Sequence, residues 1–204
     1  MLDPKILRLV AITDDAEDQR STLVDRVVAA VRGGATSVQV RLKRATPREV
    51  VEIAREIMSK VPVPVIVNDR ADIALAAGAA GVHVGEADLP VSAIRRFTPA
   101  GFIIGASLGG DAELANAKDA DYVGIGPLFT TDSKDDAGKA IGIDGFRKLA
   151  GLSGLPAIAV GGLSADRAAQ VMAAGAAGVA VVNAIFKADD PERAARAIAA
   201  AIGM

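Results

Sequence analysis

The sequence predicts an α/β fold, a (β/α)8 TIM barrel, as one compact domain spanning residues 1–204. First, eight short runs rich in β-branched residues alternate with alanine-rich segments of helical pattern, which is typical of parallel strands buried on both faces. Second, the segments GGATSVQV, AGAAGVHV and AGAAGVAV repeat one junction, in which small residues end a helix directly before a strand. Third, glycine-rich signals follow the late strands, where barrels commonly bind phosphate. The alternative, a doubly wound open sheet, would need a crevice at a switch in strand order.

The eight expected strands are apolar runs, and in chain order they span residues 8–13, 37–41, 64–69, 81–85, 102–107, 122–126, 157–161 and 178–183. Apolar residues at helical spacing predict the intervening helices at residues 16–32, 47–60, 70–77, 91–97, 111–117, 143–150, 165–174 and 191–202. Thr46 and Ser164 are expected N-caps, because a side-chain oxygen there can accept a hydrogen bond from the first helical turn. A chain of 204 residues is short for a barrel of about 250, so we expect short loops and one helix reduced to a turn.

Composition narrows the class of function. The chain has 23 Lys and Arg against 25 Asp and Glu, a formal net charge of −2, which lacks the basic footprint of a nucleic-acid-binding protein. Without Cys it can form no disulfide, thiolate metal site or cysteine nucleophile. Its first residues lack the pattern of a signal peptide, and no apolar run reaches the roughly 18–20 residues that cross a bilayer. We therefore expect a cytoplasmic protein that binds small molecules rather than nucleic acid or membrane, with homo-oligomerisation left open.

Polar residues at the carboxyl ends of the strands are the first candidates for function, because that end of a parallel barrel holds the active site. After the second strand, alternation directs Gln39, Arg41 and Lys43 to one side, where two cations are available to a phosphate or diphosphate. The alternative is a solvated basic loop. It applies less well to Arg41, which directly follows the apolar run.

Carboxylates follow the third and fourth strands. Asn68 and Asp69 end the third strand, and Asp88 follows the fourth in HVGEADLP. Neighbouring strands lie only about 4.8 Å apart, so the two carboxylates can meet at one cation, and oxygen ligands suit Mg²⁺. The alternative for each Asp is a helix N-cap. Glu86 is a third candidate carboxylate, with an exposed loop charge as its alternative.

The only histidine, His83, lies inside the fourth strand. A hydrogen-bonded structural role is favoured over a catalytic one, because a general base usually projects from a strand end. Ser107 ends the fifth strand, where its hydroxyl can contact a substrate or cap the next helix. A Ser-His-Asp hydrolase is therefore not indicated.

Late loops supply candidate phosphate contacts. After the sixth strand, the hydroxyl-rich segment GPLFTTDSK ends in Thr131, Asp132, Ser133 and the cation Lys134. This combination can bind a diphosphate. Residues 134–143 have the composition of a mobile lid, with a disordered surface loop as the alternative for residues 135–139. Backbone N–H groups near Gly162, after the seventh strand, and near Val182 and Asn183, at the end of the eighth strand, are at the common phosphate site of barrels.

Together these segments resemble the thiamine-phosphate synthase family, including its thiazole tautomerase-like branch, over nearly the whole chain. The resemblance is carried by ITD, GGATSVQVRLK, VNDRADIALAAGAAGVHVGEADLP, IGAS, DYVGIGPLFTTDSK, IAVGG and GAAGVAVVNAIF. It implies a (β/α)8 barrel that joins hydroxymethylpyrimidine diphosphate to thiazole phosphate and releases diphosphate, with Mg²⁺ as cofactor. It also implies dissociative chemistry, in which a pyrimidine-methyl cation forms and the thiazole nitrogen captures it.

The resemblance also implies roles for individual residues. It assigns Gln39, Arg41, Lys43, Asn68, Ser107 and Lys134 to the pyrimidine diphosphate. It assigns Asp69 and Asp88 to Mg²⁺. It assigns Thr131, Asp132, Ser133, Gly162, Val182 and Asn183 to the thiazole phosphate. Among these, the catalytic roles go to Arg41, Lys43, Ser107 and Lys134.

The sequence departs from the family pattern at three places. Glu86 stands where Gln is usual, Leu108 and Gly109 stand where Thr-His is frequent, and Asn183 replaces a usual Ser. Two alternative functions stay open: a thiazole tautomerase of the same fold, and a non-catalytic barrel that binds a phosphorylated ligand. Retention of both Asp residues favours the synthase, since a binder would need the phosphate site but not both metal carboxylates.

Overall fold

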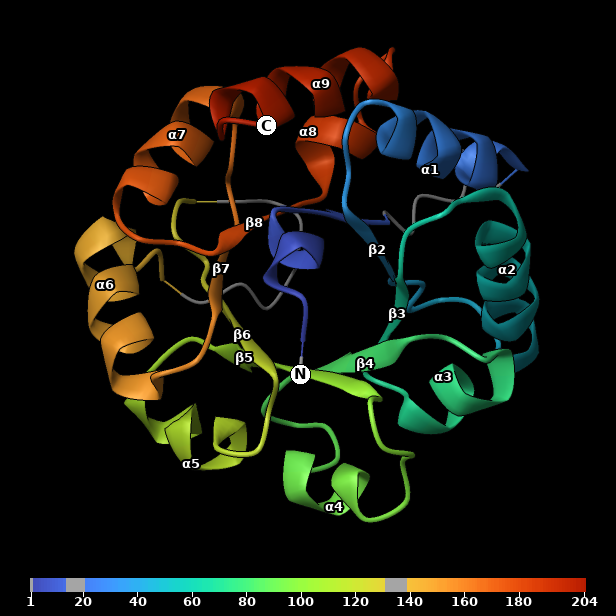
Figure 1. Cartoon of the computed structure of the whole chain (residues 1–204), viewed down its shortest axis with the longest axis horizontal. Helices are drawn as coiled ribbons and strands as arrows, with labels where there is room; N and C mark the ends of the chain where they lie inside the picture. Colours follow the sequence, from blue (N-terminus) through green and yellow to red (C-terminus); the bar gives the residue numbers. More distant parts are fainter. Residues whose placement is uncertain (1, 14–20, 131–138) are drawn as a thin grey trace.

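The computed structural model describes residues 2–13, 21–130 and 139–204. Within them, parallel strands close into a barrel in the order β1-β2-β3-β4-β5-β6-β7-β8, with helices around it (Figure 1). The predicted (β/α)8 barrel is confirmed. The strands are β1 (Leu9–Ile12), β2 (Ser37–Val40), β3 (Val65–Asn68), β4 (Gly81–Val84), β5 (Ile103–Leu108), β6 (Tyr122–Ile125), β7 (Ala157–Val160) and β8 (Gly178–Val181). The helices are η1 (Pro4–Leu7), α1 (Leu23–Arg32), α2 (Pro47–Lys60), α3 (Ala71–Ala77), α4 (Val91–Arg95), η3 (Asp111–Glu113), α5 (Leu114–Ala117), α6 (Gly142–Ser153), α7 (Ala165–Ala173), α8 (Asn183–Phe186) and α9 (Pro191–Ala201).

Local chemistry explains why several helices begin where the sequence predicts. The Thr46 side chain accepts from Glu49 N–H while the Glu49 carboxylate accepts from Thr46 N–H, a reciprocal capping box that starts α2. Ser164 accepts from Arg167 N–H at the start of α7. The helix expected to shrink to a turn is α5, which has 4 residues.

The differences from prediction concern short elements and ends. Helix α1 begins at Leu23 in the part of the chain described, and residues 14–20 lie outside it. The eighth strand was expected to run to residue 183, but it ends at Val181, and Asn183 instead opens the 4-residue helix α8. The single-turn elements η1 and α8 were not predicted, because one turn is too short for apolar periodicity to reveal. No helix among the described residues is long and apolar enough to span a bilayer.

Alternation along the strands builds two apolar layers. Odd positions of β1, Leu9 and Ala11, join the large core between the barrel and its helices. Even positions, Val10 and Ile12, join a smaller cluster that fills the barrel and includes Ile66. A side chain's parity therefore decides whether it lies inside the barrel or beneath a helix.

The amino-terminal end of the barrel is closed by η1, which lies across the centre of the ring in Figure 1. Leu7 is fully buried in the interior cluster. Ser37 Oγ donates to the Ile6 carbonyl at 2.7 Å, which ties η1 to the start of β2. Gly178 leaves room for this packing, because a Cβ there would lie 1.8 Å from the Leu7 carbonyl oxygen. A ligand must therefore reach the strand ends from the opposite, carboxyl-terminal side.

Candidate functional site

The end of β2 carries the first polar residues of the site. Gln39 points into the barrel, and its Nε2 donates to Asn68 Oδ1 of β3 at 2.7 Å. The backbone of Arg41 is fixed because Arg41 N–H donates to Thr13 Oγ1 at 2.8 Å. The Arg41 Nε is buried without a hydrogen-bond partner among the described residues. A buried guanidinium N–H normally has an acceptor, so this group is suited to an anionic ligand.

Two carboxylates and a cation meet beside these residues. Lys43 Nζ lies 3.6 Å from Asp69 Oδ2. Asp88 lies close enough to Asp69 to act on it through both charge and a side-chain hydrogen bond. Asp88 Oδ2 also accepts from Gly85 N–H at 2.7 Å, which fixes its carboxylate. Neither Asp acts as an N-cap, since the N-cap residues of α3 and α4 are Arg70 and Pro90, and neither helix has a side-chain cap.

Asp69 has a backbone conformation that side chains rarely adopt. Its φ is 64°, the only positive φ among the described non-glycine residues. Asp69 N–H donates to the His83 carbonyl of β4 at 2.7 Å, and Arg70 N–H donates to the Asn68 carbonyl at 2.8 Å. Such conformations cost free energy and concentrate at functional sites, where the surroundings hold them. The turn presents the Asp69 carboxylate toward Asp88.

The electrostatics of the pair favour a bound cation. Burial, followed by the negative charge of Asp88, raises the pKa of Asp69, while Lys43 and then Arg41 act in the opposite direction. Two carboxylate oxygens supply the hard ligands that Mg²⁺ prefers, and the remaining positions can be filled by water and substrate phosphate. Within the described residues no group of three or more acidic, His or Cys side chains converges, so a metal here would depend on the substrate for further ligands.

His83 and Ser107 belong to a polar network inside the barrel. His83 Nε2 lies 3.0 Å from Ser107 Oγ, and Nδ1 lies 3.0 Å from the Tyr122 hydroxyl. This agrees with the hydrogen-bonded role predicted for His83. Ser107 does not cap the next helical turn, whose N-cap is Gly110. Tyr122 was not singled out in the sequence, where only its inward parity at the start of the sixth strand could have indicated it.

The ends of β7 and β8 form the other side of the site. Gly162 has φ 65°, and a Cβ there would lie 2.7 Å from the Thr130 carbonyl oxygen. Asn183 Oδ1 is buried and has no partner among the described residues. Val182, the residue before α8, is half-buried. The predicted contacts Thr131, Asp132, Ser133 and Lys134 lie outside the described residues.

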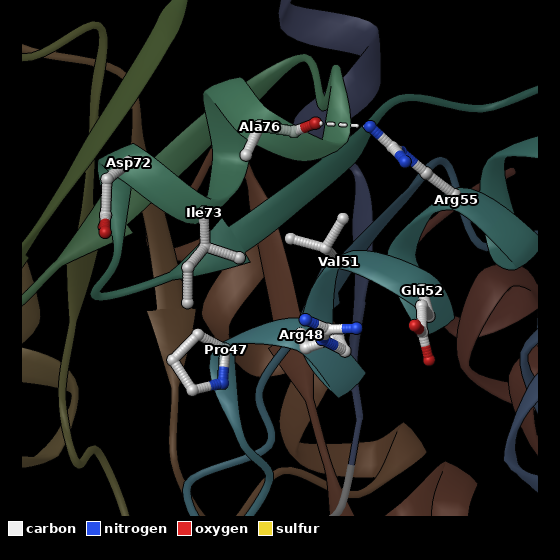
Figure 2. Close-up of a pocket in the computed structure, with 8 residues that line it drawn as sticks. All are labelled: Pro47, Arg48, Val51, Glu52, Arg55, Asp72, Ile73 and Ala76. Carbon is white, nitrogen blue, oxygen red and sulfur yellow. Dashed lines mark hydrogen bonds between the residues drawn. The ribbon is translucent and has the colours of Figure 1, made fainter.

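Two pockets lie next to each other near β2 and β3 and share Pro47 and Ile73 in their linings. The smaller, about 290 Å³, includes Lys43, Asn68, Asp69 and Asp88 and is the candidate site. The larger, about 350 Å³, lies on the outer surface between α2 and α3 (Figure 2). Its Arg55 is bound to the Ala76 carbonyl at 2.8 Å, as Figure 2 shows. The larger pocket lies between helices, whereas the smaller one lies at strand ends, where barrels hold their active sites, so the smaller pocket is the candidate site.

The departures from the family pattern fall at different depths. Glu86 is exposed. It lies in a turn that is closed by the hydrogen bond from Asp88 N–H to the Gly85 carbonyl. Leu108 is fully buried in the core beneath the helices, and Gly109 is exposed. Leu108 and Gly109 have no polar side chain that could replace the frequent Thr-His at this place.

The chain is similar to known proteins in both sequence and structure. The model of the family described as thiamine monophosphate synthase matches residues 9–185. A protein of Methanoculleus marisnigri named thiamine-phosphate synthase is 44% identical over 195 residues, covering 93% of this chain and 92% of the relative. A protein of Chloroflexus aurantiacus with the same name is 42% identical over 202 residues, covering 97% and 93%.

Solved structures agree with the sequence relatives. Thiamine phosphate pyrophosphorylase from Pyrococcus furiosus superposes with a TM-score of 0.87 at 34% identity, covering 98% of this chain and 96% of that one. A 3-hexulose-6-phosphate synthase superposes with a TM-score of 0.69 at 19% identity, covering 97% of this chain and 100% of that one. The second similarity shows the shared barrel fold alone.

Proposed function

Because the chain belongs to the thiamine monophosphate synthase family and is an enzyme of that type, we propose that it joins hydroxymethylpyrimidine diphosphate to thiazole phosphate. The products are thiamine phosphate and diphosphate. Residues 1–204 act as one domain on small-molecule substrates in the cytoplasm. Two observations support the proposal: the family match over most of the chain, and the polar groups at the ends of β2, β3 and β4.

The pyrimidine diphosphate binds to Gln39, Arg41, Lys43 and Asn68 in this proposal. The contact between Gln39 and Asn68 fixes both amides, so that they can discriminate a heterocyclic ring by hydrogen bonding. Arg41 offers its buried Nε–H to a phosphate oxygen, and that oxygen would supply the missing acceptor. Lys43 balances charge between the diphosphate and the two carboxylates.

Asp69 and Asp88 would hold Mg²⁺, and their oxygen donors and mutual repulsion fit such an ion. When bound, Mg²⁺ supplies stabilisation of the negative charge that develops on the departing diphosphate. The bond from Gly85 N–H keeps the Asp88 carboxylate oriented toward this position.

The chain's own cations and hydroxyls act on the leaving group. Arg41, Lys43 and Lys134 stabilise diphosphate as the bond to the pyrimidine methyl carbon breaks, and Ser107 donates a hydrogen bond to the same substrate. The thiazole nitrogen then captures the pyrimidine-methyl cation. This dissociative route needs positioning and electrostatics rather than a protein nucleophile, which agrees with a sequence that has no Cys.

The thiazole phosphate binds on the opposite side of the mouth. We assign it to Thr131, Asp132, Ser133, Gly162, Val182 and Asn183. The buried amide oxygen of Asn183 has no partner among the described residues and would need a hydrogen-bond donor, so the contact assigned to the phosphate is made by the amide nitrogen. Asn183 can donate through its amide nitrogen as the usual Ser would through its hydroxyl.

The observation that carries the proposal is the pairing of Asp69 and Asp88 beside Lys43 at neighbouring strand ends. The test supplies both substrates with Mg²⁺ and measures thiamine phosphate and diphosphate together. Equal amounts of the two products, lost on chelation and restored by Mg²⁺, are expected. Isomerisation of the thiazole phosphate alone would favour the tautomerase, and binding without turnover would favour a non-catalytic barrel.

A further inference from the structure

The network of Tyr122, His83 and Ser107 runs from the buried interior of the barrel to its carboxyl end. Tyr122 opens β6 and is fully buried, His83 is nearly buried on β4, and Ser107 is half-buried near the end of β5. The two rings lie 5.5 Å apart between centroids at an angle of 41°. Each ring nitrogen of His83 lies 3.0 Å from a hydroxyl oxygen.

Two glycines make room for this arrangement. A Cβ on Gly105 would lie 2.3 Å from Tyr122 Cζ and 2.5 Å from His83 Nδ1. A Cβ on Gly124 would lie 3.0 Å from His83 Cε1. The neighbouring strands β5 and β6 thus lack inward side chains where the two rings meet. An ordinary aliphatic barrel interior would fill these positions, so the chain gives up apolar packing to accommodate the network.

The hydrogen-bonding capacity of Tyr122 determines where its proton points. Burial, with the charge of Asp121 in the same direction, raises the pKa of Tyr122, so the phenol keeps its proton. Among the described residues, His83 is the one polar partner of that hydroxyl. If His83 Nδ1 carried a hydrogen and donated it, the phenol proton would have no acceptor, which is unfavourable for a buried group. The phenol therefore donates to Nδ1.

The position of the Tyr122 proton then determines the tautomer of His83 and the hydrogen bond to Ser107. With Nδ1 as acceptor, the neutral imidazole carries its hydrogen on Nε2, which donates to Ser107 Oγ. A hydroxyl that accepts from His83 keeps its own proton available for another acceptor. On β5, Ser107 follows inward-facing Gly105 by two residues, so it shares that parity and lies toward the open mouth.

We propose that Tyr122 and His83 are positioning residues that set the hydrogen-bond direction of Ser107, so that its hydroxyl donates to a phosphate oxygen of the bound substrate. The identity of that acceptor depends on the proposed function, whereas the proton arrangement depends only on the protein. Tyr122 acts through His83 and Ser107 and need not touch the substrate itself.

The proton arrangement can be measured on the unmodified protein. The chain has one His and one Tyr, so the nitrogen signals of a ¹⁵N-labelled histidine sample need no assignment. Two-bond ¹H–¹⁵N correlation at neutral pH without substrates is expected to show a protonated Nε2 and an unprotonated Nδ1. A protonated Nδ1, or a doubly protonated ring, would overturn the proposal. This result is obtained whether or not the proposed reaction occurs, so it separates the two hypotheses.

The transmission to Ser107 is tested by a double-mutant cycle. Ser107→Ala removes a bond to a charged ligand and is expected to lower kcat/KM about 10- to 150-fold. Tyr122→Phe keeps the ring but not the donor, and we expect a loss of about 2- to 12-fold, with the His83 hydrogen no longer confined to Nε2. Adding Tyr122→Phe to Ser107→Ala should lower kcat/KM no further. Independent, multiplicative losses, or an unchanged tautomer in Tyr122→Phe, would contradict the proposal.

A matched control removes a buried hydroxyl elsewhere in the barrel. Ser37 is fully buried, and its Oγ donates to the Ile6 carbonyl at the closed end. Ser37→Ala should lower the thermal midpoint while leaving kcat/KM and the His83 nitrogen signals unchanged. If Ser37→Ala lowered kcat/KM as much as Tyr122→Phe, general loosening of the barrel would explain both effects. If Tyr122→Phe did not fold, the tautomer in the unmodified protein and in Ser107→Ala would still decide the proton arrangement.

Discussion

The choice of substitution at Asp69 separates its backbone role from its role as a candidate metal ligand. Asp69 has φ 64°, a conformation that Asn tolerates and Ala does not. Left-handed backbone costs an ordinary L-residue about 1–2 kcal/mol. For a chain of this size, 1 kcal/mol shifts the thermal midpoint by about 2–4 °C, so Asp69→Ala should unfold about 2–8 °C below Asp69→Asn. The Asn variant also removes the repulsion with Asp88, so its midpoint should equal or exceed that of the unmodified protein.

The assay is thermal unfolding in a chelator, followed by Mg²⁺-dependent turnover of each variant. Both substitutions should abolish most turnover, because both remove an ionised oxygen ligand, whereas only Ala should lower the midpoint. Asp189, an exposed residue without a positive φ, gives the control pair, and its Asn and Ala variants should unfold at similar temperatures. The reasoning is refuted if Asp69→Ala is as stable as Asp69→Asn. Full turnover in either Asp69 variant would remove this residue from the metal site.

Three further variants test the remaining groups of the site. Asp88→Ala should abolish most Mg²⁺-dependent turnover in the product assay while the protein stays folded, as checked by circular dichroism; normal turnover would contradict the metal assignment. Lys134→Ala should lower kcat more than it raises the KM for thiazole phosphate, since charge on the leaving group develops in the transition state. An unchanged kcat with a higher KM would exclude that role. Gly162→Val should lower the thermal midpoint, because of φ 65° and the short approach to Thr130, and should raise the thiazole phosphate KM more than the pyrimidine KM. Equal changes in both KM values would mean that Gly162 is needed only for the conformation of the turn.

Strand parity made much of the site predictable. Gln39 and Arg41 were expected on one side of the second strand. In the structure Gln39 donates a hydrogen bond to Asn68 of the third strand. The meeting of Asp69 with Asp88 was expected from the spacing of neighbouring strands. In both cases the barrel topology, once predicted, brings together residues that are distant in the sequence.

Features that depend on detailed backbone and side-chain geometry were not predictable from the sequence. The positive φ of Asp69 arises from hydrogen bonds to β3 and β4 carbonyls, which no local pattern encodes. The contact of Tyr122 with His83 needs glycines at inward positions of β5 and β6, Gly105 and Gly124. Asn183 was expected to end a strand, but it opens α8. This helix was not predicted, because four residues are too few to show helical periodicity. Its role as a phosphate contact stays a prediction.

The closed end of the barrel has a practical consequence for attaching the protein to a surface. Arg8 Nη2 donates to the Ile202 carbonyl, so the end of α9 lies beside η1 and the starts of the strands. The chain therefore enters and leaves on the side opposite the open mouth. A tether joined to either terminus would hold the molecule with its strand ends facing the solution, whereas a tether on an α2 side chain would hold it sideways. Immobilised samples linked through the two termini should consequently bind substrate-sized ligands with equal capacity.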